Sequence, residues 1–120
     1  MKGVNYLSIN INGLDWDICC VHSGDKKLNV DNVDCYGVTY FQEQQIYFNI
    51  DISKGLFRQT VIHEIVHAFL FSFGYHLDCD EIEEAVCDFI GSHLDNIYKT
   101  TNKIIAKCYK KDGDNGGKQQ

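Results

Sequence analysis

The chain has 120 residues and a mass of 13.8 kDa, which is enough for one folded domain with one hydrophobic core. It carries 11 Lys and Arg against 17 Asp and Glu, and the resulting net charge of -6 disfavours binding to nucleic acid. The first residues lack the apolar run of a signal peptide, and no later segment has the length of a membrane span. We therefore expect a cytoplasmic protein whose partners are neither nucleic acid nor membrane.

Six cysteines raise the question of a disulfide framework. The absence of an export signal and a hydrophobic content of 44% argue against it, because a domain with this much apolar content needs no covalent staples. No Cys-x-x-Cys pair is present, so a thiolate zinc site is poorly supported as well. The cysteines are predicted to be reduced, small, buried apolar residues.

The first half of the chain has the two-residue periodicity of β-strands, interrupted by turn residues. Asn12-Gly13 suits the positive backbone dihedrals of a tight hairpin turn. A polar loop then leads to a second expected hairpin, whose last strand turns Ile46, Phe48 and Ile50 to one face. The expected strands cover residues 7–11, 16–20, 38–41 and 46–50.

A helical period replaces the strand period from residue 53 onwards. Ser53 suits a helix N-cap and Gly74 suits a helix terminator. The segment between them is apolar around nearly its whole circumference, which predicts a central helix.

A second helix is expected to begin near residue 78 or 80, because Asp78 and Glu81 have the spacing of a capping box, and to extend as far as Cys108. Residues 110–120 contain three glycines and no apolar residue, so they are predicted to form a loose tail behind a domain of residues 1–109.

The segment HEIVH, residues 63–67, falls inside the first expected helix. His63 and His67 are four residues apart, which places both imidazoles on one face, about one turn from each other. That spacing suits two ligands of one zinc ion, and Glu64 can reach a water on the ion as a general base. The alternative is a pair of satisfied core histidines beside a surface glutamate. Three polar residues within five positions of an apolar helix favour a shared partner instead.

A catalytic zinc ion needs a third protein ligand, and the second helix offers Glu81, Glu83 and Glu84. We favour Glu84, because Asp88 lies one turn further on the same face and could accept a hydrogen bond from a ligand histidine. Cys87 and Gly91 on that face are small and would allow the two helices to approach closely. Glu83 remains a rival for the third ligand.

HEIVH followed by Glu84-Ala85-Val86-Cys87-Asp88 resembles the gluzincin pattern HExxH…ExxxD and, more narrowly, the small phage-encoded and ImmA/IrrE-like metallopeptidases. The resemblance implies a zincin-like α+β fold, with a small antiparallel sheet on the HExxH helix and a second ligand-bearing helix. It implies that zinc binds to His63, His67 and Glu84, that Glu64 is the general base and that Asp88 orients a ligand histidine. The strand before the first helix would then be an edge for an extended peptide.

The expected activity is hydrolysis of a peptide bond in a peptide or protein substrate by zinc-bound water. An Asn is common where this chain has Asp88, and no helix-turn-helix segment is visible, so repressor cleavage is not implied. The alternative is a non-catalytic or latent zinc-binding regulator that acts by protein contact. By residue type, Tyr75, His76 and His93 are candidates for stabilising an oxyanion, although His93 fits a helix surface better.

Overall fold

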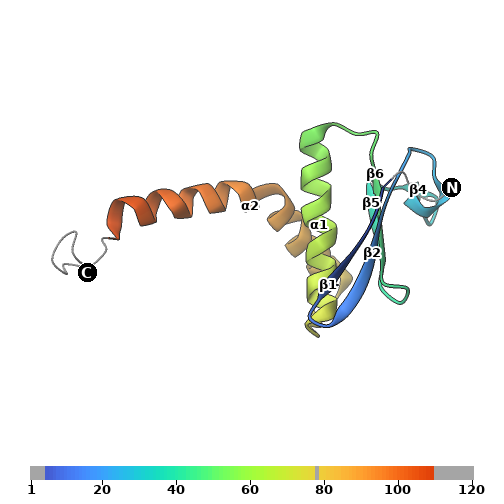
Figure 1. Cartoon of the computed structure of the whole chain (residues 1–120), viewed down its shortest axis with the longest axis horizontal. Coiled ribbons are helices and arrows are strands. Elements are labelled where there is room, and N and C mark those ends of the chain that lie inside the picture. Colours follow the sequence, from blue (N-terminus) through green and yellow to red (C-terminus); the bar gives the residue numbers. More distant parts are fainter. Residues whose placement is uncertain (1–4, 78, 110–120) are drawn as a thin grey trace.

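The computed structural model describes residues 5–77 and 79–109 and has an α+β architecture (Figure 1). A four-stranded sheet with the strand order β1-β2-β6-β5 packs against one face of helix α1, and helix α2 lies on another side of α1. The sheet strands are β1 (Asn5–Ile11), β2 (Leu14–Val21), β5 (Gly37–Tyr40) and β6 (Gln45–Asn49), and the helices are α1 (Lys54–Ser72) and α2 (Asp80–Cys108).

Both predicted hairpins are confirmed. Strands β1 and β2 pair antiparallel around Asn12 and Gly13, which have positive φ angles of 50° and 88° as the expected tight turn requires. Strands β5 and β6 also pair antiparallel.

The expectation of an antiparallel sheet is wrong at one pair, because β2 and β6 run parallel and the sheet is mixed. The connection between β2 and β5 carries a short 3-10 helix (Lys26–Leu28) and a separate two-stranded ladder of β3 (Asn29–Val30) and β4 (Val33–Asp34). This long connection leads the chain past the position next to β2, so β5 occupies the edge and β6 returns beside β2. The alternation of residues along a strand does not reveal which strand of a hairpin joins the next one.

The core lies between the sheet and α1. Trp16 and Ile46 are fully buried, and Phe48 and Ala68 pack with them. The Trp16 indole Nε1 donates to Ser72 Oγ at 2.9 Å, so the one polar atom of the buried ring is satisfied. As predicted, Ile46, Phe48 and Ile50 all contribute to this core.

The predicted limits of α1 are confirmed. Ser53 caps its N-terminus by accepting from the Leu56 amide at 3.3 Å, and Gly74 has a φ of 77° just beyond its end. Helix α2 ends at Cys108 as expected, but its N-cap is Cys79, which makes no side-chain capping bond. Asp78, proposed for a capping box, and the expected tail of residues 110–120 lie outside the described residues.

Helix α2 crosses α1 at Gly91, where an added Cβ would lie 3.0 Å from the Gln59 carbonyl oxygen. Beyond its crossing point α2 extends away from the rest of the molecule (Figure 1). Neither α1 nor α2 contains a stretch that is long and apolar enough to cross a membrane. The six cysteines are free thiols. Cys19, Cys20 and Cys87 are buried as predicted. The prediction is wrong for Cys79 and Cys108, which are exposed at the two ends of α2, and Cys35 is only half-buried.

Candidate metal centre

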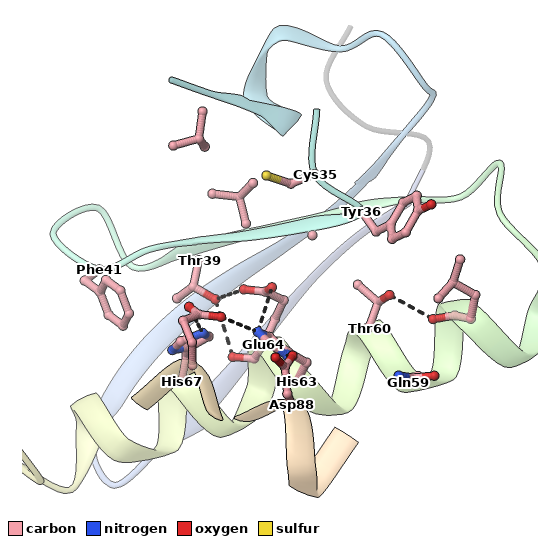
Figure 2. Close-up of a pocket in the computed structure, with 15 residues that line it drawn as sticks. Cys35, Tyr36, Thr39, Phe41, Gln59, Thr60, His63, Glu64, His67 and Asp88 are labelled. Atoms are coloured by element: carbon pink, nitrogen blue, oxygen red, sulfur yellow. Dashed lines mark hydrogen bonds and ion pairs between the residues drawn. The ribbon is translucent and has the colours of Figure 1, made fainter. Parts of the chain in front are cut away.

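Helix α1 directs the three polar residues of HEIVH towards the space beneath the edge strand β5 (Figure 2). The rings of His63 and His67 lie 5.1 Å apart between centroids, one helical turn from each other. His67 and Glu64 are buried, and only 17% of the His63 side chain is exposed. The histidine pair is therefore held close together in a largely desolvated place.

Helix α2 brings Glu84 to both histidines. One carboxylate oxygen of Glu84 lies 3.2 Å from His63 Nε2, and the other lies 3.0 Å from His67 Nε2. These three residues offer ligand atoms that all lie within 4.8 Å of one another and could hold a metal ion. The close approach depends on the small residues Cys87 and Gly91, which are buried at the crossing of the helices as the sequence analysis expected.

The other nitrogen of each histidine faces its own carboxylate. Asp88 Oδ1 lies 2.9 Å from His63 Nδ1, and Glu83 Oε2 lies 2.6 Å from His67 Nδ1. Glu83, the rival for the third ligand, therefore lies on the far side of the His67 ring from Glu84. Asp88 has the orienting position that was expected of it.

The hydrogen-bonding roles of the two rings favour a positive charge between them. A carboxylate only accepts, so the hydrogen bond between Glu83 and His67 favours a proton on His67 Nδ1, and the Asp88 carboxylate beside His63 Nδ1 favours the same tautomer there. In a neutral imidazole Nε2 then carries a lone pair, and both Nε2 atoms point at Glu84, which also only accepts. With neutral imidazoles, two Nε2 lone pairs and the Glu84 carboxylate converge, and such a group of acceptors favours a cation between them.

The distances fit a small tetrahedral ion. Two ligand atoms that are both ~2.0 to 2.1 Å from one zinc ion lie roughly 3.3 Å apart in tetrahedral geometry. The separations of 3.0 and 3.2 Å between Glu84 oxygens and the two Nε2 atoms are close to that value. Each Nε2 atom therefore lies at a distance from a Glu84 oxygen that two ligands of one small ion can have.

A second group of potential ligands, His67, Glu83 and Cys87, lies behind the first. Burial and then the nearby carboxylates of Glu83 and Glu84 raise the pKa of the Cys87 thiol to about 12. The thiolate form that binds metals is therefore strongly disfavoured there. Glu83 is also hydrogen-bonded to His67, so this group is better suited to orienting His67 in the first site than to binding a metal ion of its own.

Glu64 lies beside this constellation and is held from the sheet. The Thr39 hydroxyl on β5 donates to Glu64 Oε1 at 2.6 Å, and Figure 2 shows the two side chains pointing towards one another. Burial raises the pKa of the Glu64 carboxyl, while the Thr39 hydrogen bond and the two histidines act in the opposite direction. The other oxygen of Glu64, Oε2, is 3.9 Å from His63 Nε2. The hydrogen bond from Thr39 therefore fixes the orientation of the Glu64 carboxyl group, which can accept a proton next to the ligand atoms.

A cavity of about 530 Å³ opens over these residues. Strand β5 and the residues around it lie on one side of the cavity and α1 lies on the other (Figure 2), and Glu84 and Asp88 of α2 also line it. Tyr75, His76 and His93 are not among its lining residues, and His93 packs against Phe89 on the outer face of α2 instead. The apolar part of the lining consists of Val30, Tyr36, Val38, Phe41 and Leu56.

Two residues of β5 that the sequence analysis did not single out belong to this site. Thr39 positions Glu64, and Gly37 allows the strand to approach α1, since an added Cβ would lie 2.8 Å from Thr60 and 2.9 Å from Glu64. A Gly and a Thr at alternate positions of a strand that precedes a metal-binding helix are a weak signal of this close contact. Comparisons with protein-family models, with curated proteins and with solved structures found no match to this chain.

Proposed function

We propose that the protein is a small zincin-like metallopeptidase that binds zinc through His63, His67 and Glu84. The observation that carries the proposal is the convergence of two Nε2 lone pairs on the Glu84 carboxylate, with both Nδ1 atoms tied to carboxylates behind them. Three protein ligands of the types His, His and Glu leave the fourth tetrahedral position open, which is the composition of a catalytic zinc site rather than a structural one.

Zinc in this place would acidify a water molecule to a pKa of roughly 7 and polarise a substrate carbonyl. Glu64 would accept the proton of that water, because Thr39 holds one of its oxygens and the other faces the ligand atoms. The same carboxyl group would then give the proton to the departing amine, as its burial favours the protonated form. Thr39 keeps the carboxyl group directed into the cavity during both transfers.

The sheet edge supports a peptide as the substrate. Strand β5 pairs only with β6, so its other edge is free of strand partners within the described residues, and that strand lines the cavity above Glu64. An extended peptide could add to this edge through main-chain hydrogen bonds and lie across the metal-binding residues. The apolar lining at Val38 and Leu56 would favour substrates with an apolar side chain near the cleaved bond.

Metal content and peptide cleavage test the proposal together. Protein purified without chelators or added metal should contain about one zinc ion per chain by elemental analysis, and Glu84→Ala should lose it. The zinc-loaded protein should cleave members of a peptide library, and Glu64→Gln should abolish cleavage while it keeps the zinc.

Glu81→Ala is the matched control for Glu84→Ala, since Glu81 is an exposed glutamate of the same helix outside the ligand group. Zinc binding that is equally strong in wild type and Glu84→Ala would refute the ligand assignment. Zinc binding without cleavage of any peptide, with Glu64→Gln indistinguishable from wild type, would refute the peptidase and leave a zinc-binding regulator.

A further inference from the structure

The part of α2 beyond its crossing with α1 exposes an apolar stripe. The last hydrogen bonds between α2 and α1 within the described residues involve Ser92, which accepts from Gln59, and Asp95, which accepts from Arg58. Every residue after Gly91 in α2 is exposed to solvent. Five large apolar side chains share one side of this segment at helical spacing, each between 40% and 68% exposed, and together they form the distal stripe: Leu94, Ile97, Tyr98, Ile104 and Ile105.

The distal stripe has no cover within the described residues, and residues 110–120 contain no apolar side chain that could provide one. A helical segment of this length is marginal in water by itself, and solvent-facing isoleucines add no stability to it. Lys99 and Lys103 project from the opposite side of the helix, as expected from a rotation of about 100° per residue, so the stripe itself carries no charge. The segment is therefore amphipathic, with the distal stripe on one side and the two lysines on the other.

The stripe is symmetric about Thr101. Tyr98 and Ile104 lie three residues to either side of Thr101, and Ile97 and Ile105 lie four residues to either side. Seven residues away lie Leu94 on one side and Cys108 on the other. A two-fold axis through Thr101 would bring each member of the stripe against an apolar residue of an identical helix. Such self-complementarity is the requirement of an isologous interface.

From these observations we infer that two copies of the chain pair through the distal stripes of antiparallel α2 helices, with Thr101 at the two-fold axis. In this arrangement Cys108 of one copy lies at Leu94 of the other, just where α2 leaves α1 at Asp95. The exposed segment of each α2, residues 94–108, is therefore covered along its whole length by the same segment of the other copy. Antiparallel pairing also sets the helix dipoles in opposite directions, and it places the two folded bodies at opposite ends of the paired segment.

The paired segment from residue 94 to residue 108 is about 21 Å long, so the interface belongs to the small class of specific interfaces. We expect a dimer whose formation depends on concentration. Sedimentation equilibrium of the full chain over roughly 1 μM to 1 mM measures it directly. A chain that stays monomeric over that whole range would overturn the inference.

Matched charge insertions test the surface. Ile104→Glu places a carboxylate on the stripe, and Ala106→Glu places one two residues later on the opposite side of the same exposed segment. Ile104→Glu should weaken dimerisation at least tenfold, and Ala106→Glu should change it less than twofold. Circular dichroism should show the same helical content in both monomers. Equal effects of the two variants, or none from Ile104→Glu, would show that the stripe is not the interface.

Thiol cross-linking tests the orientation. In a Cys79→Ser/Cys108→Ser background, Thr101→Cys should be joined across the axis by a short bifunctional thiol reagent, and the background protein alone should not. With Cys79→Ser alone, the two Cys108 thiols of an antiparallel pair are about 21 Å apart along the helices and should remain unlinked. Efficient linkage through Cys108 would instead establish parallel pairing and overturn the antiparallel arrangement.

Discussion

The two halves of α2 differ in what their side chains contact. In the first half, residues 80–95, carboxylates point inwards to α1, and Glu83, Glu84 and Asp88 all contact histidines of that helix. In the second half, residues 96–108, the isoleucines are about half exposed, and no residue of this segment is buried. The position of the first half therefore depends on its contacts with the histidines of α1. The stability of the second half depends on a partner surface that covers its isoleucines.

The first half of α2 is held against α1 mainly by polar contacts. In the first half, the only fully buried residues are Cys87 and Gly91, which let the backbones approach but supply little apolar contact area. Contact between the helices is instead maintained by polar contacts. Glu83 is hydrogen-bonded to His67, Asp88 lies at ion-pair distance from His63, and Asp95 accepts from Arg58. A cation among His63, His67 and Glu84 would convert three mutually repelling acceptors into a cross-link between the helices.

The largest expected effect comes from separating the helices at their crossing. Gly91→Val would place its Cβ 3.0 Å from the Gln59 carbonyl oxygen and 3.4 Å from His63 Cβ, with further methyl groups beyond. We expect a loss of about 1–3 kcal/mol in the free energy of unfolding and zinc binding weakened by more than tenfold, because Glu84 moves away from the histidines. Urea denaturation and a competitive zinc titration measure the two losses.

Ser92→Val is the matched control for Gly91→Val, since the side chain of Ser92 is exposed at the edge of the same contact. If Gly91→Val bound zinc as tightly as Ser92→Val, close approach of the helices would not be what assembles the site.

Local sequence signals were sufficient for much of this structure. The turn at Asn12-Gly13, the cap at Ser53, the terminator at Gly74 and the histidine spacing in α1 all depend on residues a few positions apart. The parallel pairing of β2 with β6 was not predictable, because it depends on how a long connection crosses the molecule.

The choice between Glu83 and Glu84 as the third ligand was only partly predictable from the sequence. Glu83 and Glu84 are neighbours that differ by about 100° around the helix, so only the orientation of α2 against α1 decides which one reaches the Nε2 atoms. Thr39 is a further long-range case. Its contact with Glu64 joins residues 25 positions apart, and the local sequence gives only the weak signal of a Gly and a Thr at alternate positions of the strand.

The two carboxylates behind the histidines should contribute unequally to metal affinity. The Glu83 side chain is 24% exposed and the Asp88 side chain is 71% exposed, so water can replace Asp88 more easily. We expect Glu83→Ala to weaken zinc binding about 10- to 100-fold and Asp88→Ala to weaken it less. Glu83→Gln, which keeps an acceptor oxygen, should recover part of the loss. A larger effect of Asp88→Ala than of Glu83→Ala in zinc competition would contradict this order.

The buried Glu64 of α1 should also affect how the stability of the metal-free protein depends on pH. Burial raises the pKa of Glu64 above its ordinary value of 4.5, so the folded state retains this proton at pH values where the unfolded state has released it. The stability contributed by this protonation is complete below pH 4.5 and is lost as the pH rises through the folded-state pKa.

Glu64→Gln removes this titration and keeps an oxygen for the Thr39 hydroxyl. We expect the stability of the metal-free variant, relative to wild type, to increase as the pH rises from 4.5 towards 7, measured by urea denaturation in the presence of a chelator. A constant difference between the two proteins over this range would show that Glu64 does not carry the burial cost.

The smallest expected effect lies in the second half of α2, where changes in helix propensity should act without reaching the metal centre. Asn102→Ala and Thr101→Ala are neighbouring exposed positions, and each should favour the helix by a few tenths of a kcal/mol, up to about 0.7. Both variants should show higher ellipticity at unchanged zinc affinity. Only Thr101 lies at the centre of the distal stripe, so only Thr101→Ala should change self-association. A change in zinc affinity in either variant would mean that the two halves of α2 are coupled, and the division of the helix at Asp95 would have to be abandoned.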